Sequence, residues 1–218
     1  MSFIVKPSEI EKTSFEIITK ELGNRTFPEG QSEVVKRVIH TTADFDYADN
    51  LYFSENVIEN AKNAILNGAT VITDTNMALS GINKKILAQF GGEVHCFMAD
   101  EQVAREAKER GVTRAIVSME HAAKLKEPLI FAIGNAPTAL IHLYELIKQG
   151  DVNPALVVGV PVGFVNVVES KELFISSNIP HIIAKGRKGG SNVAAAIINA
   201  ILYQLVTREG FEKWVKKQ

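Results

Sequence analysis

The stretch Leu129-Ile130-Phe131-Ala132-Ile133-Gly134-Asn135-Ala136-Pro137 is the most informative one about the fold, because an unbroken apolar run leads directly into a turn. The run is shorter than an average helix, and its branched and aromatic side chains favour a strand. Because apolar residues occupy both faces, the run is typical of a parallel strand that helices cover on both sides. Pro137 suits the first position of a following helix, where its missing N–H costs little.

The same pattern recurs on both sides of this stretch. Helical stretches near Asp100–Arg110, Pro137–Gln149 and Val165–Ser176 separate most of the apolar runs. Alternating strands and helices predict an α/β fold, a flavodoxin-like, doubly wound parallel sheet of five strands in the order 2-1-3-4-5, with helices on both faces. The other four predicted strands are Thr70–Thr73, Val94–Met98, Leu156–Val160 and His181–Ala184.

Helical patterns flank this core at both ends of the chain. Lys6–Leu22 and Ser32–His40 carry apolar residues at helical spacing, and Ser54 can cap a third helix. Ser191–Val206 is strongly apolar, so we expect it in the core or at a subunit interface. We predict one domain, residues 1–218, with an N-terminal helical segment of about 1–68 packed on the α/β core.

The composition is that of an ordinary globular protein. Hydrophobic residues make up 46% of the chain and charged residues 22%, and the formal net charge is -1. Disorder and a chain-wide field for nucleic acid or anionic membranes are therefore excluded. Met1–Glu9 lacks the pattern of a secretory signal, and no apolar run reaches the ~20 residues of a membrane span, so we expect a cytoplasmic protein. The one cysteine, Cys96, is expected in the core of a strand.

Four turns follow predicted strands and should meet at one edge of the sheet, which is the usual ligand site of such folds. In the last of them, Gly186, Gly189 and Gly190 allow close backbone approach, Ser191 can cap the following helix, and flanking basic side chains add positive charge. Together they favour a phosphate or carboxylate. The alternative is a solvated surface loop. The spacing fits neither a P-loop nor a strong dinucleotide fingerprint. The four turns are Asp74–Met77, Gly134–Thr138, Gly159–Phe164 and Lys185–Ser191.

Among the five histidines, His40 has a setting of its own, at the end of an apolar, basic helix. On local evidence a helix-end or packing role is the commoner one, although imidazole suits acid–base chemistry near neutral pH. The other four, at positions 95, 121, 142 and 181, are interpreted as structural. Asn135 can cap the next helix or reach a ligand, and capping is favoured. We expect no metal site, because there is no H-E-x-x-H and no close histidine pair.

Five segments, in this order along the chain, resemble the precorrin-8X methylmutase family, and the His-Thr-Thr-Ala-Asp-Phe-Asp version resembles its cobalt-precorrin-8 branch. They are Val38–Phe45, Thr73–Met77 with Gly81-Ile82, Ile133–Leu140, Gly159–Val165 with Glu169-Ser170-Lys171-Glu172, and Gly186–Ser191.

The resemblance implies a methyl migration from C-11 to C-12 of a corrinoid macrocycle, giving hydrogenobyrinate or cobyrinate. It also implies a homodimer with the tetrapyrrole near the subunit interface and no dissociable cofactor, since any cobalt belongs to the substrate. The family's catalytic histidine matches His40, its site serine matches Ser14, and its Thr-Arg pair matches Thr113-Arg114, although the residues after Arg114 depart from the family pattern. The further substrate-binding residues that we expect are Thr75, Met77, Asn135, Gly163, Phe164, Arg187, Lys188, Gly189, Gly190 and Ser191.

The sequence leaves two other functional hypotheses open. The first is a protein that holds a corrinoid without changing it. The second, based on the Gly186–Ser191 turn alone, is an unrelated α/β enzyme that uses a phosphate or a nucleotide.

Overall fold

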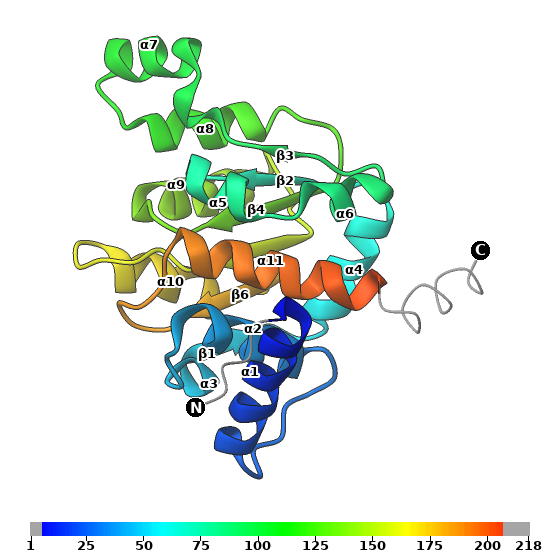
Figure 1. Cartoon of the computed structure of the whole chain (residues 1–218). Helices are drawn as coiled ribbons and strands as arrows, with labels where there is room; N and C mark the ends of the chain where they lie inside the picture. The colour runs from blue at the N-terminus through cyan, green and yellow to red at the C-terminus, as the bar shows by residue number, and fades with distance from the viewer. Residues whose placement is uncertain (1–5, 207–218) are drawn as a thin grey trace.

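A six-stranded sheet forms the centre of the molecule in the computed structural model, which describes residues 6–206 (Figure 1). Residues 1–5 of the segment considered for a secretory signal lie outside that range. The strand order is β1-β6-β5-β4-β2-β3. The strands are β1 Leu51–Phe53, β2 Thr70–Thr73, β3 Val94–His95, β4 Leu129–Ile133, β5 Leu156–Gly159 and β6 His181–Ala184.

The order 2-1-3-4-5 is confirmed for the five parallel strands, β2 to β6. The prediction of an all-parallel, five-stranded sheet is wrong, because β1 pairs antiparallel with β6, with Leu51 opposite Ala184 and Phe53 opposite Ile182. A strand of three residues at a sheet edge has one neighbour and little apolar length, so its pattern is weak. The sheet is therefore mixed and mostly parallel.

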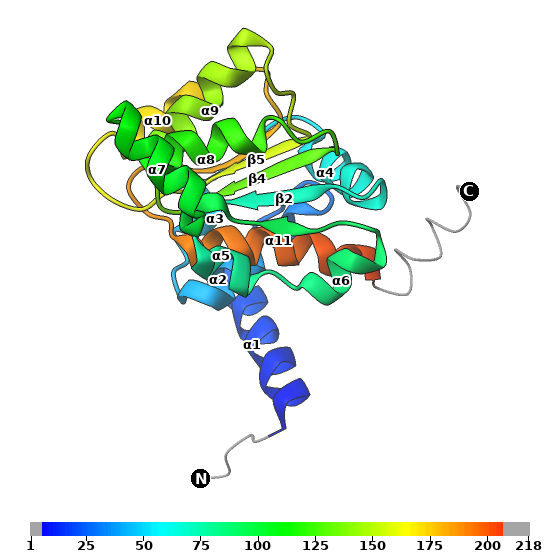
Figure 2. The ribbon, with the colours of Figure 1, turned by 90° about the horizontal axis from the view of Figure 1, so that it is seen from above.

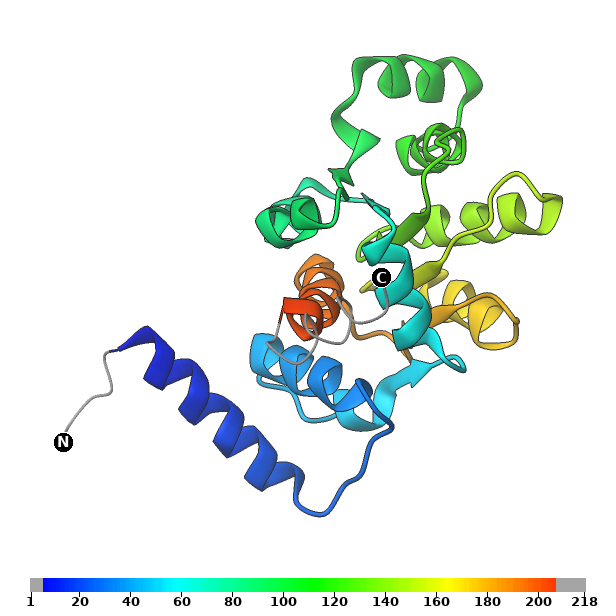
Figure 3. The same cartoon turned by 90° about the vertical axis from the view of Figure 1, so that its right-hand side faces the viewer.

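Alternate side chains of the strands enter two separate cores. Val71, Ile130 and Val158 pack with α2 (Gln31–Thr42), α4 (Val57–Leu66) and α11 (Ser191–Val206) on one face. Ile72, Phe131 and Val157 pack with α8 (Arg114–Ala122), α9 (Pro137–Gln149) and α10 (Val167–Ile175) on the other. Figure 3 shows the two layers of helices on either side of the strands. Each such side chain contributes about 1.5–3 kcal/mol on burial, and the two layers leave both faces of the sheet dry.

The N-terminal helices differ from the rest in how they are placed. Helix α1 (Pro7–Leu22) projects from the body of the molecule (Figures 2 and 3) and buries Ile18 and Leu22, whereas Ile10 and Ile17 are 45% and 51% exposed. Helix α2 continues past the expected end at His40 to Thr42.

Other boundaries also differ from the expected ones. The Ser54 hydroxyl accepts the His181 N–H instead of capping α4. The expected strand Val94–Met98 ends at His95, and a short 3-10 helix, η1 (Phe97–Ala99), follows. Cys96 is consequently half-buried between two elements, not in the core of a strand.

No helix within residues 6–206 has the length and apolar character that a membrane span needs. The remaining helices are α3 Tyr47–Asn50, α5 Asn76–Gly81, α6 Lys84–Gln89 and α7 Glu101–Arg110.

Charged side chains link α7 to α8, and α8 to α9. Arg110 on α7 contacts Glu106 at 2.7 Å and forms a bidentate pair with Glu120 on α8. The Nε2 atom of His142 lies 2.9 Å from Glu120 and that of His121 lies 3.0 Å from Glu106. All four histidines expected to be structural therefore have protein partners, since His181 contacts the Ile179 carbonyl at 2.7 Å and His95 contacts Glu93 at 3.0 Å.

We expect Glu120→Gln to destabilise the protein at neutral pH by about 1 kcal/mol, and progressively less as the pH falls. The hydrogen bond from Arg110 holds the pKa of Glu120 below its usual value. Its stabilising contribution is thus complete above the usual glutamate pKa and is lost as the pH falls through the lowered pKa. Urea unfolding from pH 7 down to about pH 3 measures this. Glu109→Gln, at an exposed position on α7, is the control, and a difference that stays constant with pH would contradict the prediction.

Candidate active site

The four turns expected at the carboxyl edge of the sheet do converge, and hydrogen bonds join them. The Thr75 and Ser191 hydroxyls lie 2.8 Å apart, which links the end of β2 to the start of α11. The Gly190 N–H donates to the Val160 carbonyl at 2.9 Å, and the Gly163 N–H donates to the Arg187 carbonyl at 3.2 Å. The turns after β2, β5 and β6 therefore form one continuous surface.

Asp74 connects the fourth turn to this surface. Its Oδ1 atom accepts the Gly134 N–H at 2.9 Å, and its Oδ2 atom accepts the N–H groups of Asn135 and Ala136 at 2.7 and 2.6 Å. The side chain is buried; burial raises its pKa, and the three backbone hydrogen bonds oppose that shift. A buried carboxylate thus shapes the turn between β4 and α9 from inside.

Glycines permit the close approach of these turns. A Cβ atom on Gly189 would lie 2.0 Å from the Val160 carbonyl oxygen, and one on Gly134 would lie 2.7 Å from the Ser191 Cα atom. Gly190 has a φ of 137°, which glycine adopts without strain. The backbone of the Gly186–Ser191 loop can consequently pack directly against its neighbours.

His40 lies near the end of α2, exposed, with its ring stacked on Phe15 of α1 at a centroid distance of 5.1 Å and an angle of 15°. Ser14 precedes Phe15 and bonds the Ile10 carbonyl of its own helix. Four residues after His40, Asp44 contacts the Lys188 ammonium at 2.6 Å. This contact brings the end of α2 to the rim of the Gly186–Ser191 loop, so the histidine segment and the predicted carboxylate-binding loop are neighbours.

Lys188, a predicted substrate-binding residue, is paired with two carboxylates of the protein. Its Nζ atom lies 2.6 Å from both Asp44 and Asp46. The hydrogen bonds that Lys188 donates to Asp44 and Asp46 raise the pKa of Lys188, and the bond to Asp44 lowers the pKa of that carboxyl group. In this arrangement the ammonium joins two segments of the protein, and a substrate carboxylate would have to share it.

Apolar side chains stand exposed at the same edge. Met77 is 70% and Phe164 is 80% exposed, and the Arg187 guanidinium lies 5.4 Å from the centre of the Phe164 ring. Large exposed apolar groups next to positively polarised turns suit a ligand that has an apolar ring and a charged rim.

Arg114 and Asn135 lie at the starts of two adjacent helices. Arg114 is exposed as the first residue of α8, and Thr113 caps that helix and contacts Thr138 of α9 at 3.4 Å. The expected capping role of Asn135 is wrong, because Ala136 holds the cap position and the Asn135 side chain is exposed without a hydrogen bond in the described structure. The backbone N–H of Asn135 donates to Asp74, so the main chain of this residue is held while its side chain is exposed.

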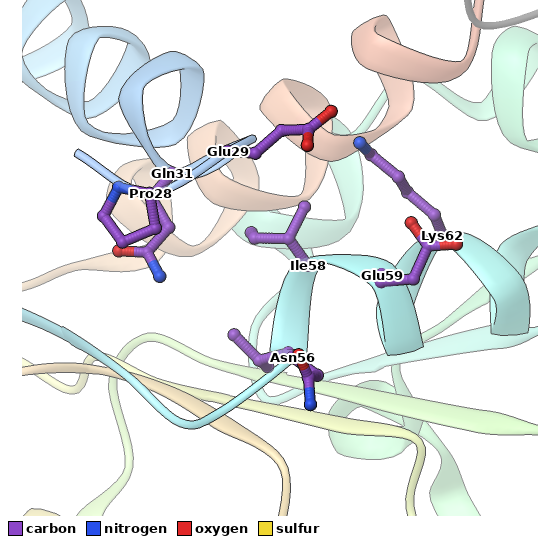
Figure 4. Close-up of a pocket in the computed structure, with 8 residues that line it drawn as sticks. Pro28, Glu29, Gln31, Asn56, Ile58, Glu59 and Lys62 are labelled. Carbon is purple, nitrogen blue, oxygen red and sulfur yellow. The ribbon is translucent and has the colours of Figure 1, made fainter.

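A cavity of about 370 Å³ lies away from these turns (Figure 4). The cavity adjoins Asn56, which lies two residues after Ser54. Ser54 bonds His181, the first residue of β6. The cavity therefore lies at the amino edge of the parallel strands. None of the predicted site residues lines it. Within residues 6–206, no group of three or more His, Cys, Asp or Glu side chains could hold a metal ion. The cavity is lined by Pro28, Glu29, Gln31, Asn56, Val57, Ile58, Glu59 and Lys62.

The roles of Asp74, Asp44 and Phe15 were not predicted from the sequence. Asp74 was placed in a turn at the ligand-binding edge, and an acidic residue directly after a buried strand was a usable signal for it. Asp44 lies in a segment that carries the family resemblance, but its pairing with Lys188 and the stacking of Phe15 on His40 had no local signal, because these partners lie on other elements.

Known proteins resemble this chain over nearly its whole length. Residues 9–204 match the family model described as Precorrin-8X methylmutase. The chain is 47% identical to the cobalt-precorrin-8 methylmutase of Salmonella typhimurium, over 94% of this chain and 99% of that protein. It is 36% identical to the precorrin-8X methylmutase of Pseudomonas aeruginosa, over 92% and 97%. The crystal structure of the precorrin-8X methylmutase from Thermus thermophilus superimposes with a TM-score of 0.82 at 38% identity, covering 89% of this chain and 96% of that one. The chain therefore belongs to the precorrin-8X methylmutase family, isomerases of cobalamin biosynthesis.

Proposed function

We propose that this protein moves a methyl group from C-11 to C-12 of precorrin-8X or cobalt-precorrin-8, with His40 as the proton donor, to give hydrogenobyrinate or cobyrinate. The observation that carries the proposal is the Lys188–Asp44 contact, because it places the end of the His40 helix beside the loop best suited to bind carboxylates.

The chemistry requires one proton and accurate positioning. Protonation of the macrocycle by the imidazolium of His40 creates electron demand at C-12, and the methyl group moves there from C-11 with its bonding electrons. Loss of a proton restores the neutral conjugated ring, so no atom is gained or lost overall. Because the reaction is intramolecular and involves no net oxidation or reduction, it needs no added cofactor. Holding the large ring in one orientation lowers the entropic part of the barrier.

The substrate's acetate and propionate groups suit the turns at this edge. The N–H groups at the start of α11, the Gly186–Ser191 loop and the exposed guanidinium groups of Arg114 and Arg187 all favour carboxylates. Met77 and Phe164 offer apolar contact to the ring faces. The other expected contacts, Ser14, Thr75, Asn135 and Gly163, complete the proposed site.

We favour the cobalt-containing substrate. Four relatives that are 43–47% identical carry the name cobalt-precorrin-8 methylmutase, whereas relatives that are 32–37% identical carry either that name or precorrin-8X methylmutase. Incubation with each substrate, followed by the absorption change to cobyrinate or hydrogenobyrinate, tests both the reaction and the branch. Binding of both substrates without any spectral change would favour a corrinoid-binding protein instead.

We also propose a homodimer with the active site near the subunit interface. Exposed apolar side chains lie on the projecting helix α1 (Ile10, Ile17) and at the site edge (Phe164, Val165), where a second subunit could cover them. Sedimentation equilibrium at micromolar concentration tests this, and a monomer that turns over normally would refute it.

We expect Arg187→Ala to raise the KM for the corrinoid about 10–100-fold with little change in kcat, since a charge-assisted hydrogen bond to a carboxylate contributes about 1.5–3 kcal/mol. Arg105→Ala, which removes an exposed arginine from α7, is the matched control. Equal KM values in the two variants would remove Arg187 from substrate binding.

A further inference from the structure

Lys171 of α10 is a buried cation that the proposed mechanism does not use. It has no exposed surface and is one of the largest fully buried side chains of the described structure. Its ammonium donates to the Gly186 carbonyl at 2.7 Å and to the Lys188 carbonyl at 2.9 Å. No carboxylate within residues 6–206 forms an ion pair with it. A buried ammonium without a counter-ion is costly, so its place beneath this loop needs a reason.

The planarity of the peptide bond supplies that reason. In a trans peptide, the carbonyl of one residue and the N–H of the next point in opposite directions, and the described chain has no cis peptide. When Lys171 draws the Gly186 and Lys188 carbonyls towards itself, the N–H groups of Arg187 and Gly189 must point away from it. Two alternate peptides of the loop thus acquire the same orientation from a single side chain.

These two N–H groups are free to bind a ligand. Neither the Arg187 nor the Gly189 N–H has an acceptor among the described residues, whereas the neighbouring Gly190 N–H is bound by Val160. Burial lowers the pKa of Lys171 to about 8, so Lys171 still carries its charge in most molecules at neutral pH. A positive charge behind the loop, screened little by water, also increases the attraction for an anion in front of it.

We propose that Lys171 is a positioning residue that orients the N–H groups of Arg187 and Gly189 to receive one substrate carboxylate. The inference rests on the proposed function, because it assigns one carboxylate of that substrate to these two backbone groups.

The test is Lys171→Met, which keeps the length of the side chain and removes the ammonium, with Lys62→Met at the opposite sheet edge as the control. A crystal structure of the variant should show the peptides 186–187 and 188–189 rotated. Its Kd for cobyrinate should rise about 10–100-fold, as expected for the loss of charge-assisted hydrogen bonds. The kcat at saturating substrate should change little, because His40 is untouched. Unrotated peptides, or an unchanged Kd despite rotated peptides, would each overturn the proposal.

A second measurement uses the unaltered protein, in case the variant does not fold. Adding cobyrinate should shift the backbone amide NMR signals of Arg187 and Gly189 downfield, and the amide signal of Gly190 should move less because it is already bonded to Val160. Bound cobyrinate that moves neither signal would overturn the assignment. If the proposed function is wrong, the wild-type protein will neither convert nor bind the corrinoid. The crystal structure of the variant will still show whether Lys171 determines the orientation of the two peptides.

Discussion

His40→Ala is expected to lower conversion of the corrinoid about 10²–10⁴-fold and to leave corrinoid binding nearly intact, because general acid catalysis contributes on that order. His40 is exposed at the end of α2, so its removal leaves no cavity in the core and no buried group without a partner. Its stacking on Phe15 holds the ring in one orientation, which the transfer of a proton to a fixed point on the macrocycle requires. Single-turnover absorption kinetics with saturating enzyme would measure the chemical step, and a binding titration with cobyrinate would measure affinity.

His142→Asn is the matched control for this experiment. His142 lies on α9 and contacts Glu120 and Glu145, so its loss removes an imidazole without touching the turns of the site. We expect normal turnover in the control. A His40→Ala protein that converts substrate at the wild-type rate would exclude His40 as the proton donor, whatever its affinity.

Asp74→Asn is expected to destabilise the protein by about 3 kcal/mol and to weaken corrinoid binding at the same time. An amide has one acceptor oxygen, whereas the carboxylate accepts from Gly134 at one oxygen and from Asn135 and Ala136 at the other. In either orientation, a buried NH₂ group faces at least one buried N–H, and each lost charge-assisted hydrogen bond costs about 1.5–3 kcal/mol. For a chain of this length the loss corresponds to a decrease in Tm of roughly 6–12 °C.

Calorimetry and a corrinoid titration on the same preparation check this prediction. Asp100→Asn is a suitable control, because Asp100 is an exposed cap of α7 and asparagine caps a helix about as well as aspartate. A stable Asp74→Asn protein would show that the three N–H groups find other acceptors and that the turn does not depend on the charge.

Local sequence patterns specify the parallel strands of the central sheet. Runs such as 129–133 and 156–159 are apolar on both faces, and this pattern requires helices on both sides, because neither face of the strand can be left in water. Once the strands are parallel, their carboxyl ends share one edge, so the positions of the four turns follow from topology. The edge strand β1 escaped prediction because its three residues depend on pairing with β6, about 130 residues further along the chain, and not on a pattern of their own.

The chemical environment of the site follows from contacts between distant parts of the chain. Residue types and turns pointed to His40 and to the Gly186–Ser191 loop, but not to the partners that give each group its state. Lys188 finds Asp44 across 144 positions of sequence, Asp74 finds Gly134 across 60, and Lys171 is buried under a loop whose carbonyls it orients. The physical reason is range: strand formation and capping depend on neighbours in sequence, whereas ion pairs, burial and peptide orientation depend on distances in space that exist only after the chain has folded.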